Sequence, residues 1–227
     1  MKKILEKKFN TKFDDKIDPF QYFFGHIINT ITTEDNDDQY AIHNFNGGNS
    51  MSYPPSTDIM VKYILENYSG KNHIDIGGSR GYLSKRLIDQ GLNSYCLDGW
   101  TYGIDNNMLD IDMSKYVVCD MVSGPFNELN FEKFFDVSTA FEITEHIHEK
   151  DIKLFYDNVS YMSKEHICSI HTGGVDSTMG YITNHHNVKS KEWWINLLKN
   201  YGQVTEMPQL KPSLGWDESE FLKVTFK

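Results

Sequence analysis

Arginine is nearly absent from this 227-residue sequence, which contains only Arg80 and Arg86. The other cationic residues are lysines, and acidic residues outnumber them, so that the formal net charge at pH 7 is −10. Arginine is the preferred side chain for bidentate phosphate contacts, and nucleic-acid affinity depends on neutralising phosphates. This composition therefore argues against a general nucleic-acid or acidic-membrane binder, and it leaves only a local basic patch open.

Cysteine is also scarce, and long apolar runs are missing. Cys96, Cys119 and Cys168 are an odd number at wide spacing, which predicts buried reduced thiols rather than disulfides or a CxxC metal knuckle. No apolar run approaches the length of a membrane span, and no apolar core follows the basic start of the chain. We therefore expect a cytoplasmic protein without a membrane partner. The sequence holds no information on its oligomeric state.

The length suits one α/β domain, here expected over residues 56–227, with residues 1–55 as an appendage or lid. A helix that covers one edge of a sheet is an equally open interpretation of residues 1–55. From residue 56 onward, apolar runs of strand length alternate with helical patterns. The expected helices span 57–69, 82–90, 150–162 and 190–201, and the expected strands span 72–76, 94–97, 116–119, 135–141, 166–170, 203–207 and 221–226. This alternation predicts a doubly wound, seven-stranded and mostly parallel sheet whose last two strands are antiparallel.

The segment HIDIGGSRGYLSKRL, residues 73–87, carries the most informative pattern. A strand ends at Asp75, Gly77 and Gly78 form a turn, and Gly81 stands where a helix begins. Glycine is needed where the backbone takes a positive φ or approaches a ligand closely. Such turns lie beside the carboxyl ends of strands, where α/β proteins bind ligands. A purely structural connection between strand and helix is the alternative.

The spacing is D-x-G-x-x-x-G and differs from the G-x-G-x-x-G of nicotinamide dinucleotide folds. It resembles motif I of the class I S-adenosylmethionine-dependent methyltransferases, in which this turn holds the methionine part of the cofactor. Ser79 stands where many members of that family have a glycine. Because serine is small, we expect this departure to matter little.

Two further acidic residues end the next two expected strands. Asp98, followed by Gly99, comes about twenty residues after the glycine turn, where a carboxylate can accept hydrogen bonds from both ribose hydroxyls. Asp120, followed by Met121, matches the family position that binds the adenine amino group. Each aspartate alone could equally be a solvated loop residue. The resemblance therefore implies these cofactor-binding residues: Asp75, Gly77, Gly78, Ser79, Gly81, Asp98, Gly99, Asp120 and Met121.

The strand FFDVSTAF runs directly into the E-x-x-E-H segment Glu142, Glu145 and His146. If the chain turns helical there, Glu142 faces the other two residues at spacings of three and four. Three polar side chains would then converge at the carboxyl end of a central strand. The alternative is a solvated first helical turn, in which glutamate is favoured by the helix dipole.

His185 and His186 precede a later helix and complete a candidate metal site. Two carboxylates with one or two imidazoles suit Mn, Co or Zn, or Mg with water in its shell. The E-x-x-E-H run with a later histidine is similar to the metal site of the small-RNA 3′-terminal 2′-O-methyltransferases, and ubiquinone-pathway O-methyltransferases contain a related run. The resemblance implies Glu142, Glu145, His146 and either His185 or His186 as ligands. A substrate contact without metal is the competing interpretation.

The expected function is S-adenosylmethionine-dependent O-methylation of a small hydroxylated metabolite or sugar, with divalent-metal assistance as an option. The candidate catalytic residues are Glu142, His146 and His171; His171 follows the next strand, where an imidazole could act as a general base or donate a hydrogen bond to the substrate. One alternative is ribose 2′-O-methylation of RNA, although the charge argues against a nucleic-acid partner. A second alternative is a regulatory protein that binds the cofactor without transferring a methyl group.

Overall fold

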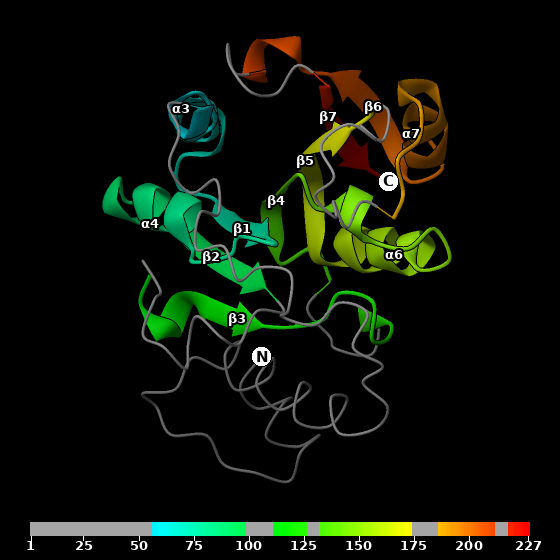
Figure 1. Ribbon diagram of the computed structural model, residues 1–227. Coiled ribbons are helices and arrows are strands. Elements are labelled where there is room, and N and C mark those ends of the chain that lie inside the picture. The colour runs from blue at the N-terminus through cyan, green and yellow to red at the C-terminus, as the bar shows by residue number, and fades with distance from the viewer. Residues whose placement is uncertain (1–55, 99–110, 127–131, 174–185, 212–217) are drawn as a thin grey trace, which may run out of the picture.

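The computed structural model describes residues 56–98, 111–126, 132–173, 186–211 and 218–227. A seven-stranded sheet crosses the molecule, with strand order β3-β2-β1-β4-β5-β7-β6 (Figure 1). The strands are β1 Asn72–Ile76, β2 Asn93–Asp98, β3 Tyr116–Val118, β4 Phe135–Phe141, β5 Ser163–His171, β6 Gly202–Glu206 and β7 Ser219–Phe226. The first five strands are parallel, and β7 runs antiparallel to both β5 and β6. The predicted doubly wound sheet and its antiparallel end are confirmed.

Helices cover both faces of this sheet. The helices are α3 Ser56–Tyr68, α4 Tyr82–Asp89, α6 Ile152–Met162 and α7 Lys191–Leu198. The described residues also contain three 3₁₀ turns: η2 Met113–Lys115 and η4 Thr144–His146 lie between α4 and α6, and η5 Pro208–Leu210 follows β6. Helices α3 and α4 lie on one side of the sheet and α6 and α7 on the other (Figure 1). Within the described residues, no helix has both the length and the apolar character that crossing a membrane requires.

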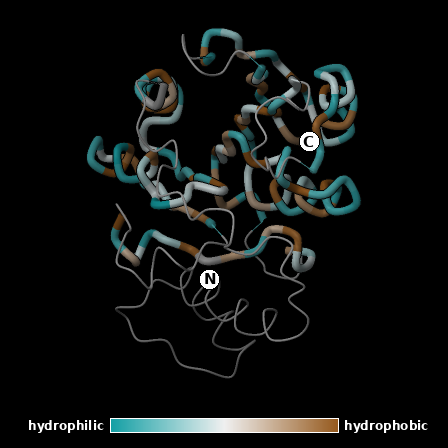
Figure 2. Tube along the Cα trace, viewed as in Figure 1, coloured by the Kyte–Doolittle hydropathy of each residue, from teal (hydrophilic) through white to brown (hydrophobic). Residues whose placement is uncertain are grey.

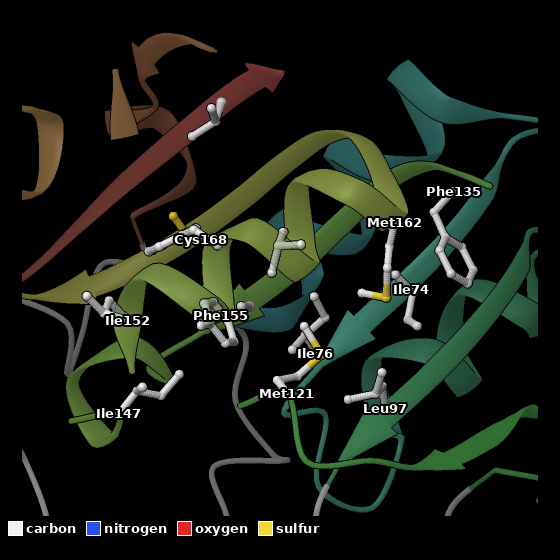
Figure 3. Close-up of a cluster of buried hydrophobic side chains, with 14 of the residues drawn as sticks. Ile74, Ile76, Leu97, Met121, Phe135, Ile147, Ile152, Phe155, Met162 and Cys168 are labelled. Atoms are coloured by element: carbon white, nitrogen blue, oxygen red, sulfur yellow. The ribbon is translucent and has the colours of Figure 1, made fainter. Parts of the chain in front are cut away.

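Of the three hydrophobic clusters among the described residues, the two largest hold the layers together. Ile74, Leu97 and Phe135 of the strands pack with Phe155 and Met162 of α6 in the larger cluster (Figure 3). The smaller cluster packs residues of α3 and α4, among them Ile64 and Leu87, against the opposite face. Apolar and polar residues are interspersed along the described helices and strands (Figure 2), and most of the large apolar side chains are buried. Burial of such side chains supplies about 25 cal/mol for each Å² removed from water, so these clusters fix the sheet.

The strand order reverses between β1 and β4, because the chain proceeds from β1 outward to β3 before it returns to β4. At such a reversal the loops after the two strands diverge and leave a crevice outside their carboxyl ends, where open α/β sheets bind ligands. The two loops that begin here are the glycine turn after β1 and the E-x-x-E-H segment after β4. The fold thus places the two most informative sequence motifs side by side.

Candidate functional site

The turn after β1 is built from residues with left-handed backbone conformations. Gly77 has φ 71° and Gly81 has φ 83°, and Ser79 between them has φ 51°. A Cβ atom on Gly77 would also collide with the side chain of Ile143 from the neighbouring loop. The turn therefore selects residues by backbone conformation, and the small size of serine does not remove the strain at position 79.

We expect Ser79→Gly to raise the free energy of unfolding by about 0.5–1 kcal/mol, because glycine adopts this conformation without the Cβ clash that strains serine. Chemical denaturation measures this change. Ser79→Ala is the matched control, since alanine removes the hydroxyl and keeps the Cβ atom. A gain in Ser79→Ala equal to that in Ser79→Gly would show that the hydroxyl, and not the backbone, is the source of the effect.

Asp98, at the end of β2, stabilises the glycine turn that follows the neighbouring strand β1. Its Oδ2 atom accepts a hydrogen bond from the backbone N–H of Ser79 at 2.7 Å. The side chain is half-buried, and its carboxylate lies against the glycine turn. The structure thus brings together Asp98 and the glycine turn, as the sequence predicts for a shared cofactor site. Gly99, the other residue predicted here, lies outside the described residues.

Asp75 is buried directly beneath the turn, with 5% of its surface exposed. Thr139 of β4 donates a hydrogen bond to its Oδ1 atom at 2.6 Å. Burial raises the pKa of Asp75 to about 7; repulsion from Asp98 adds to this rise, and the Thr139 hydrogen bond opposes it. A buried carboxyl group whose pKa is raised by burial and by a neighbouring carboxylate is typical of a functional site.

Asp120 and Met121 follow β3 at the same edge of the sheet. The Oδ1 atom of Asp120 accepts the N–H of Val122 at 2.9 Å, which closes a tight turn. The side chain of Met121 packs into the larger hydrophobic cluster (Figure 3). The backbone carbonyl of Met121 accepts a hydrogen bond from Asn158 of α6 at 2.8 Å. Met121 therefore contributes its backbone, rather than its side chain, to the shape of this loop.

The sequence analysis missed Asn158, which organises the loop after β3. Its side chain is 1% exposed, donates to the carbonyls of Met121 and Gly124, and accepts from the N–H of Phe126. A buried asparagine that satisfies three backbone groups fixes a loop that has no regular structure of its own. The sequence feature that could have indicated this role is a single asparagine among the apolar positions of α6.

Glu142 begins the E-x-x-E-H segment in a conformation that the sequence analysis did not expect. Its φ is 53°, so the chain leaves β4 through a left-handed residue and forms only the short 3₁₀ turn η4 from Thr144 onward. The condition for Glu142 to face Glu145 and His146, a helical turn that begins at Glu142, is therefore not met. A non-glycine residue in this region costs on the order of 1–3 kcal/mol and persists where surrounding contacts impose it.

Ser169 of β5 supplies those contacts. Its Oγ atom accepts the backbone N–H of Glu142 at 2.9 Å and donates to the Glu142 Oε1 atom at 2.8 Å. Ser169 lies beside Phe141 in the register of β4 and β5, so the contact reaches the residue directly after the strand. The hydroxyl thus binds both the backbone and the carboxylate of Glu142 and holds the side chain at the sheet edge.

Glu145 is completely buried, and neither of its carboxylate oxygens has a hydrogen-bond partner among the described residues. Burial, and then repulsion from the Glu142 carboxylate, raises the pKa of Glu145 well above its usual range. The backbone carbonyl of Glu145 accepts the N–H groups of His186 and Asn187 at 2.7 and 3.0 Å. These bonds bring the later histidine segment against the E-x-x-E-H segment, although the two are far apart in the sequence.

The histidines of the predicted metal site take different positions. His146 is half-buried in η4, whereas His186 is exposed and stacks on the ring of His148 with a centroid distance of 4.2 Å. His185 lies outside the described residues. Across the ranges that the structure describes, no three His, Cys, Asp or Glu side chains form a group that could hold a metal ion.

His171 lies at the end of β5 between two carboxylates. Its Nδ1 atom is 3.9 Å from Oε2 of Glu142, and its Nε2 atom is 3.4 Å from Oε2 of Glu218. Sequence reasoning identified His171 and missed Glu218. Glu218 lies near His171 because the antiparallel pairing of β5 and β7 places its neighbour Ser219 opposite His171. No local sequence pattern predicts such a pairing. The arrangement places an imidazole between two carboxylates at the carboxyl end of β5.

Several solved structures share this fold. The small-RNA methyltransferase HEN1 is 16% identical over 75% of this chain, with a TM-score of 0.53, and this chain spans 25% of that protein. The PH0226 protein from Pyrococcus horikoshii OT3 is 14% identical, with 85% of this chain and all of that chain covered and a TM-score of 0.57. The 1,6-didemethyltoxoflavin-N1-methyltransferase of Burkholderia thailandensis, solved with S-adenosylhomocysteine, is 12% identical over 94% of this chain and 92% of its own, with a TM-score of 0.52.

Comparisons of sequence alone find no such relatives. No family model matches the chain. No curated protein matches it either. The structural likeness therefore concerns the fold, and the function has to be argued from the site.

Proposed function

We propose that this chain transfers a methyl group from S-adenosylmethionine to a hydroxyl group of a small molecule. The observation that carries the proposal is the joining of Asp98 to the glycine turn at the point where the strand order reverses. Asp75 lies under the same turn, so a carboxylate is available near both the ribose and the methionine side of a bound cofactor. The neighbouring structures solved with S-adenosylhomocysteine support this choice of cofactor.

The residues after β4 and β5 have the chemistry that the acceptor requires. Methyl transfer to oxygen needs the acceptor hydroxyl held in line with the sulfonium methyl group, and it needs a group that takes the hydroxyl proton. Glu142 and His171 face one another across the sheet edge, and either can accept that proton. Most of the acceleration would come from holding the two reactants together, with proton transfer as a further contribution.

The two carboxylates of the E-x-x-E-H segment have the oxygen ligands that divalent cations prefer, although the side chains within the described residues do not converge on a metal site in their present positions. Two carboxylates that repel one another, one of them buried with both oxygens unpartnered, would be stabilised by a positive charge between them. We propose Glu142, Glu145, His146 and one histidine of the pair His185 and His186 as the residues that would hold it. A bound cation would lower the pKa of the acceptor hydroxyl and orient it.

If this assignment is right, methyl transfer falls at least tenfold in excess EDTA and returns on addition of Mn²⁺, Zn²⁺ or Mg²⁺. The measurement is transfer of labelled methyl from S-adenosylmethionine, with calorimetric binding of S-adenosylhomocysteine as the control, because the glycine turn does not depend on the cation. Unchanged transfer in EDTA, with no metal found by elemental analysis, would leave Glu142, His146 and His171 as direct acid, base and substrate contacts.

A ribose hydroxyl of RNA is the second candidate acceptor, and the fold shared with a small-RNA methyltransferase together with the E-x-x-E-H segment favours it. RNA binding requires positive side chains that neutralise several phosphates, and each neutralised phosphate adds close to one unit to the dependence of log affinity on log salt concentration. In a chain with net charge −10 and two arginines, this positive charge would have to come from scattered lysines. We therefore favour the small acceptor.

One experiment separates the candidates. The protein is incubated with labelled S-adenosylmethionine and, in parallel, with short RNA bearing a free 3′ end or with a fraction of small hydroxylated metabolites. Label in the metabolite fraction alone supports the proposal, and label on RNA ribose replaces it with the second candidate. Tight cofactor binding with label in neither pool would favour a regulatory protein.

A further inference from the structure

A chain of buried hydrogen bonds crosses three strands and ends on Asp75. The Ser94 Oγ atom of β2 lies 2.7 Å from Nδ1 of His73, and His73 Nε2 lies 3.0 Å from Oγ1 of Thr139. Thr139 in turn lies 2.6 Å from the Asp75 Oδ1 atom. Ser94, His73 and Thr139 are completely buried, and Asp75 is 5% exposed. Four polar side chains are thus joined within the sheet beneath the candidate cofactor turn.

The direction of each hydrogen bond in this chain follows from the charge at its end. An ionised Asp75 can only accept, so the Thr139 hydroxyl donates to it and must itself accept from His73. Burial lowers the pKa of His73 to about 3, so the ring is neutral and has a single N–H group. That N–H belongs on Nε2, facing Thr139, and the bare Nδ1 accepts the hydroxyl of Ser94.

The two carboxylate oxygens of Asp75 face different groups, one the chain of hydrogen bonds and the other the glycine turn. Oδ1 accepts from Thr139, whereas Oδ2 faces the turn so closely that a Cβ atom on Gly78 would lie 2.7 Å from it. The groups around the carboxylate are Asp98 and Cys96 from β2, Thr139 from β4 and His73 from its own strand. Asp98 repels a second negative charge, so the donor from β4 is the group that favours the ionised form.

We propose that Thr139 and His73 are positioning residues that keep the Asp75 carboxylate ionised and oriented toward a cationic group of the cofactor. This inference rests on the proposed function, because S-adenosylmethionine supplies that positive charge through its sulfonium and ammonium groups. The hydrogen-bond chain sets both the charge and the rotation of a carboxylate that burial alone would protonate. Neither Thr139 nor His73 touches the crevice itself, since both are completely buried.

The test compares Thr139→Val with Thr139→Ser in calorimetric titrations of S-adenosylmethionine from pH 6 to 8.5. In the wild type, affinity rises with pH through about 7, as Asp75 ionises. Valine lacks the donor, so the midpoint moves upward by about one pH unit, and affinity falls about fivefold at pH 7 but stays within twofold at pH 8.5. Serine keeps the donor and the wild-type profile. A loss that is the same at every pH, or an equal loss with serine, would overturn the inference.

A second measurement needs no variant and covers the case in which Thr139→Val does not fold. Nitrogen-15 NMR of the wild type should show His73 neutral from pH 5.5 to 8 and protonated on Nε2 at the upper end of this range, where Asp75 is ionised. A proton on Nδ1 at the upper end of this range would break the deduced order of donors and overturn the inference. Absence of cofactor binding by the wild type at every pH would overturn the proposed function, and this role with it.

Discussion

Asp98→Ala weakens S-adenosylmethionine binding by about 1–3 kcal/mol in calorimetry. The substitution removes a charge-assisted acceptor for the ribose hydroxyls, and it also leaves the N–H of Ser79 without the partner that it has at 2.7 Å. Asp98→Asn separates the two effects. Asparagine keeps one acceptor oxygen for Ser79 and loses the charge, so it should preserve stability and retain part of the affinity.

Asp136→Ala is the matched control for Asp98→Ala. Asp136 also accepts a backbone N–H, that of Asn72 at 3.0 Å, and it pairs with Lys164, but it lies at the amino end of β4 and therefore at the opposite edge of the sheet. Its removal should lower stability modestly and leave cofactor affinity unchanged. Equal loss of affinity in both variants, or NADH binding in place of S-adenosylmethionine, would contradict the assignment of the glycine turn.

The contact between Asp98 and the glycine turn could be predicted because these residues are marked locally. Asp75 and Asp98 each close a short apolar run, and parallel strands bring their carboxyl ends to one edge, so the order of the motifs along the chain fixes their meeting point. The conformation of Ser79 could not be predicted in the same way. The turn that closes around Asp98 imposes the left-handed conformation on Ser79, and serine is not a residue type that indicates this conformation in a sequence.

The candidate acceptor half of the site depends on contacts between segments that are distant in the sequence. The sequence therefore did not predict the conformation of Glu142 or the partner of His171. The spacing of Glu142, Glu145 and His146 suggested a helix, but Ser169 binds the backbone of Glu142 and turns the chain out of β4. The partner of His171 comes from the start of β7, through a register that only the folded sheet defines. Local periodicity carries no information on either contact.

The same limit applies to the hydrogen-bond chain beneath the turn. Thr139 lies beside Asp75 because β1 and β4 are neighbours in a parallel register, although the two strands are separated in the sequence by β2 and β3. A serine, a histidine and a threonine inside strands look like scattered polar residues in a sequence. Their function becomes visible only when burial removes water as a partner and leaves each of them with its neighbour on the next strand.

Glu142→Gln lowers the rate of methyl transfer by about 10²- to 10⁴-fold while S-adenosylhomocysteine binds with unchanged affinity. This range is the usual contribution of a group that takes a proton in the transition state. Glutamine retains the size of the side chain and an oxygen that can accept the Ser169 hydroxyl, so the left-handed turn persists. What disappears is the negative charge that faces His171 and the candidate acceptor position.

Glu149→Gln is the control, because Glu149 lies only a few residues further on, is exposed, and pairs with Lys189 at 2.6 Å. It should leave the transfer rate and the affinity within about twofold of the wild type, as a surface ion pair contributes less than about 1 kcal/mol. The acceptor in both assays is the pool that labels with the wild type. Transfer by Glu142→Gln at the wild-type rate would remove Glu142 from the catalytic site. Loss of S-adenosylhomocysteine binding would instead show that the loops after β1 and β4 move as one unit. The close approach of Ile143 to the glycine turn makes such coupling physically possible.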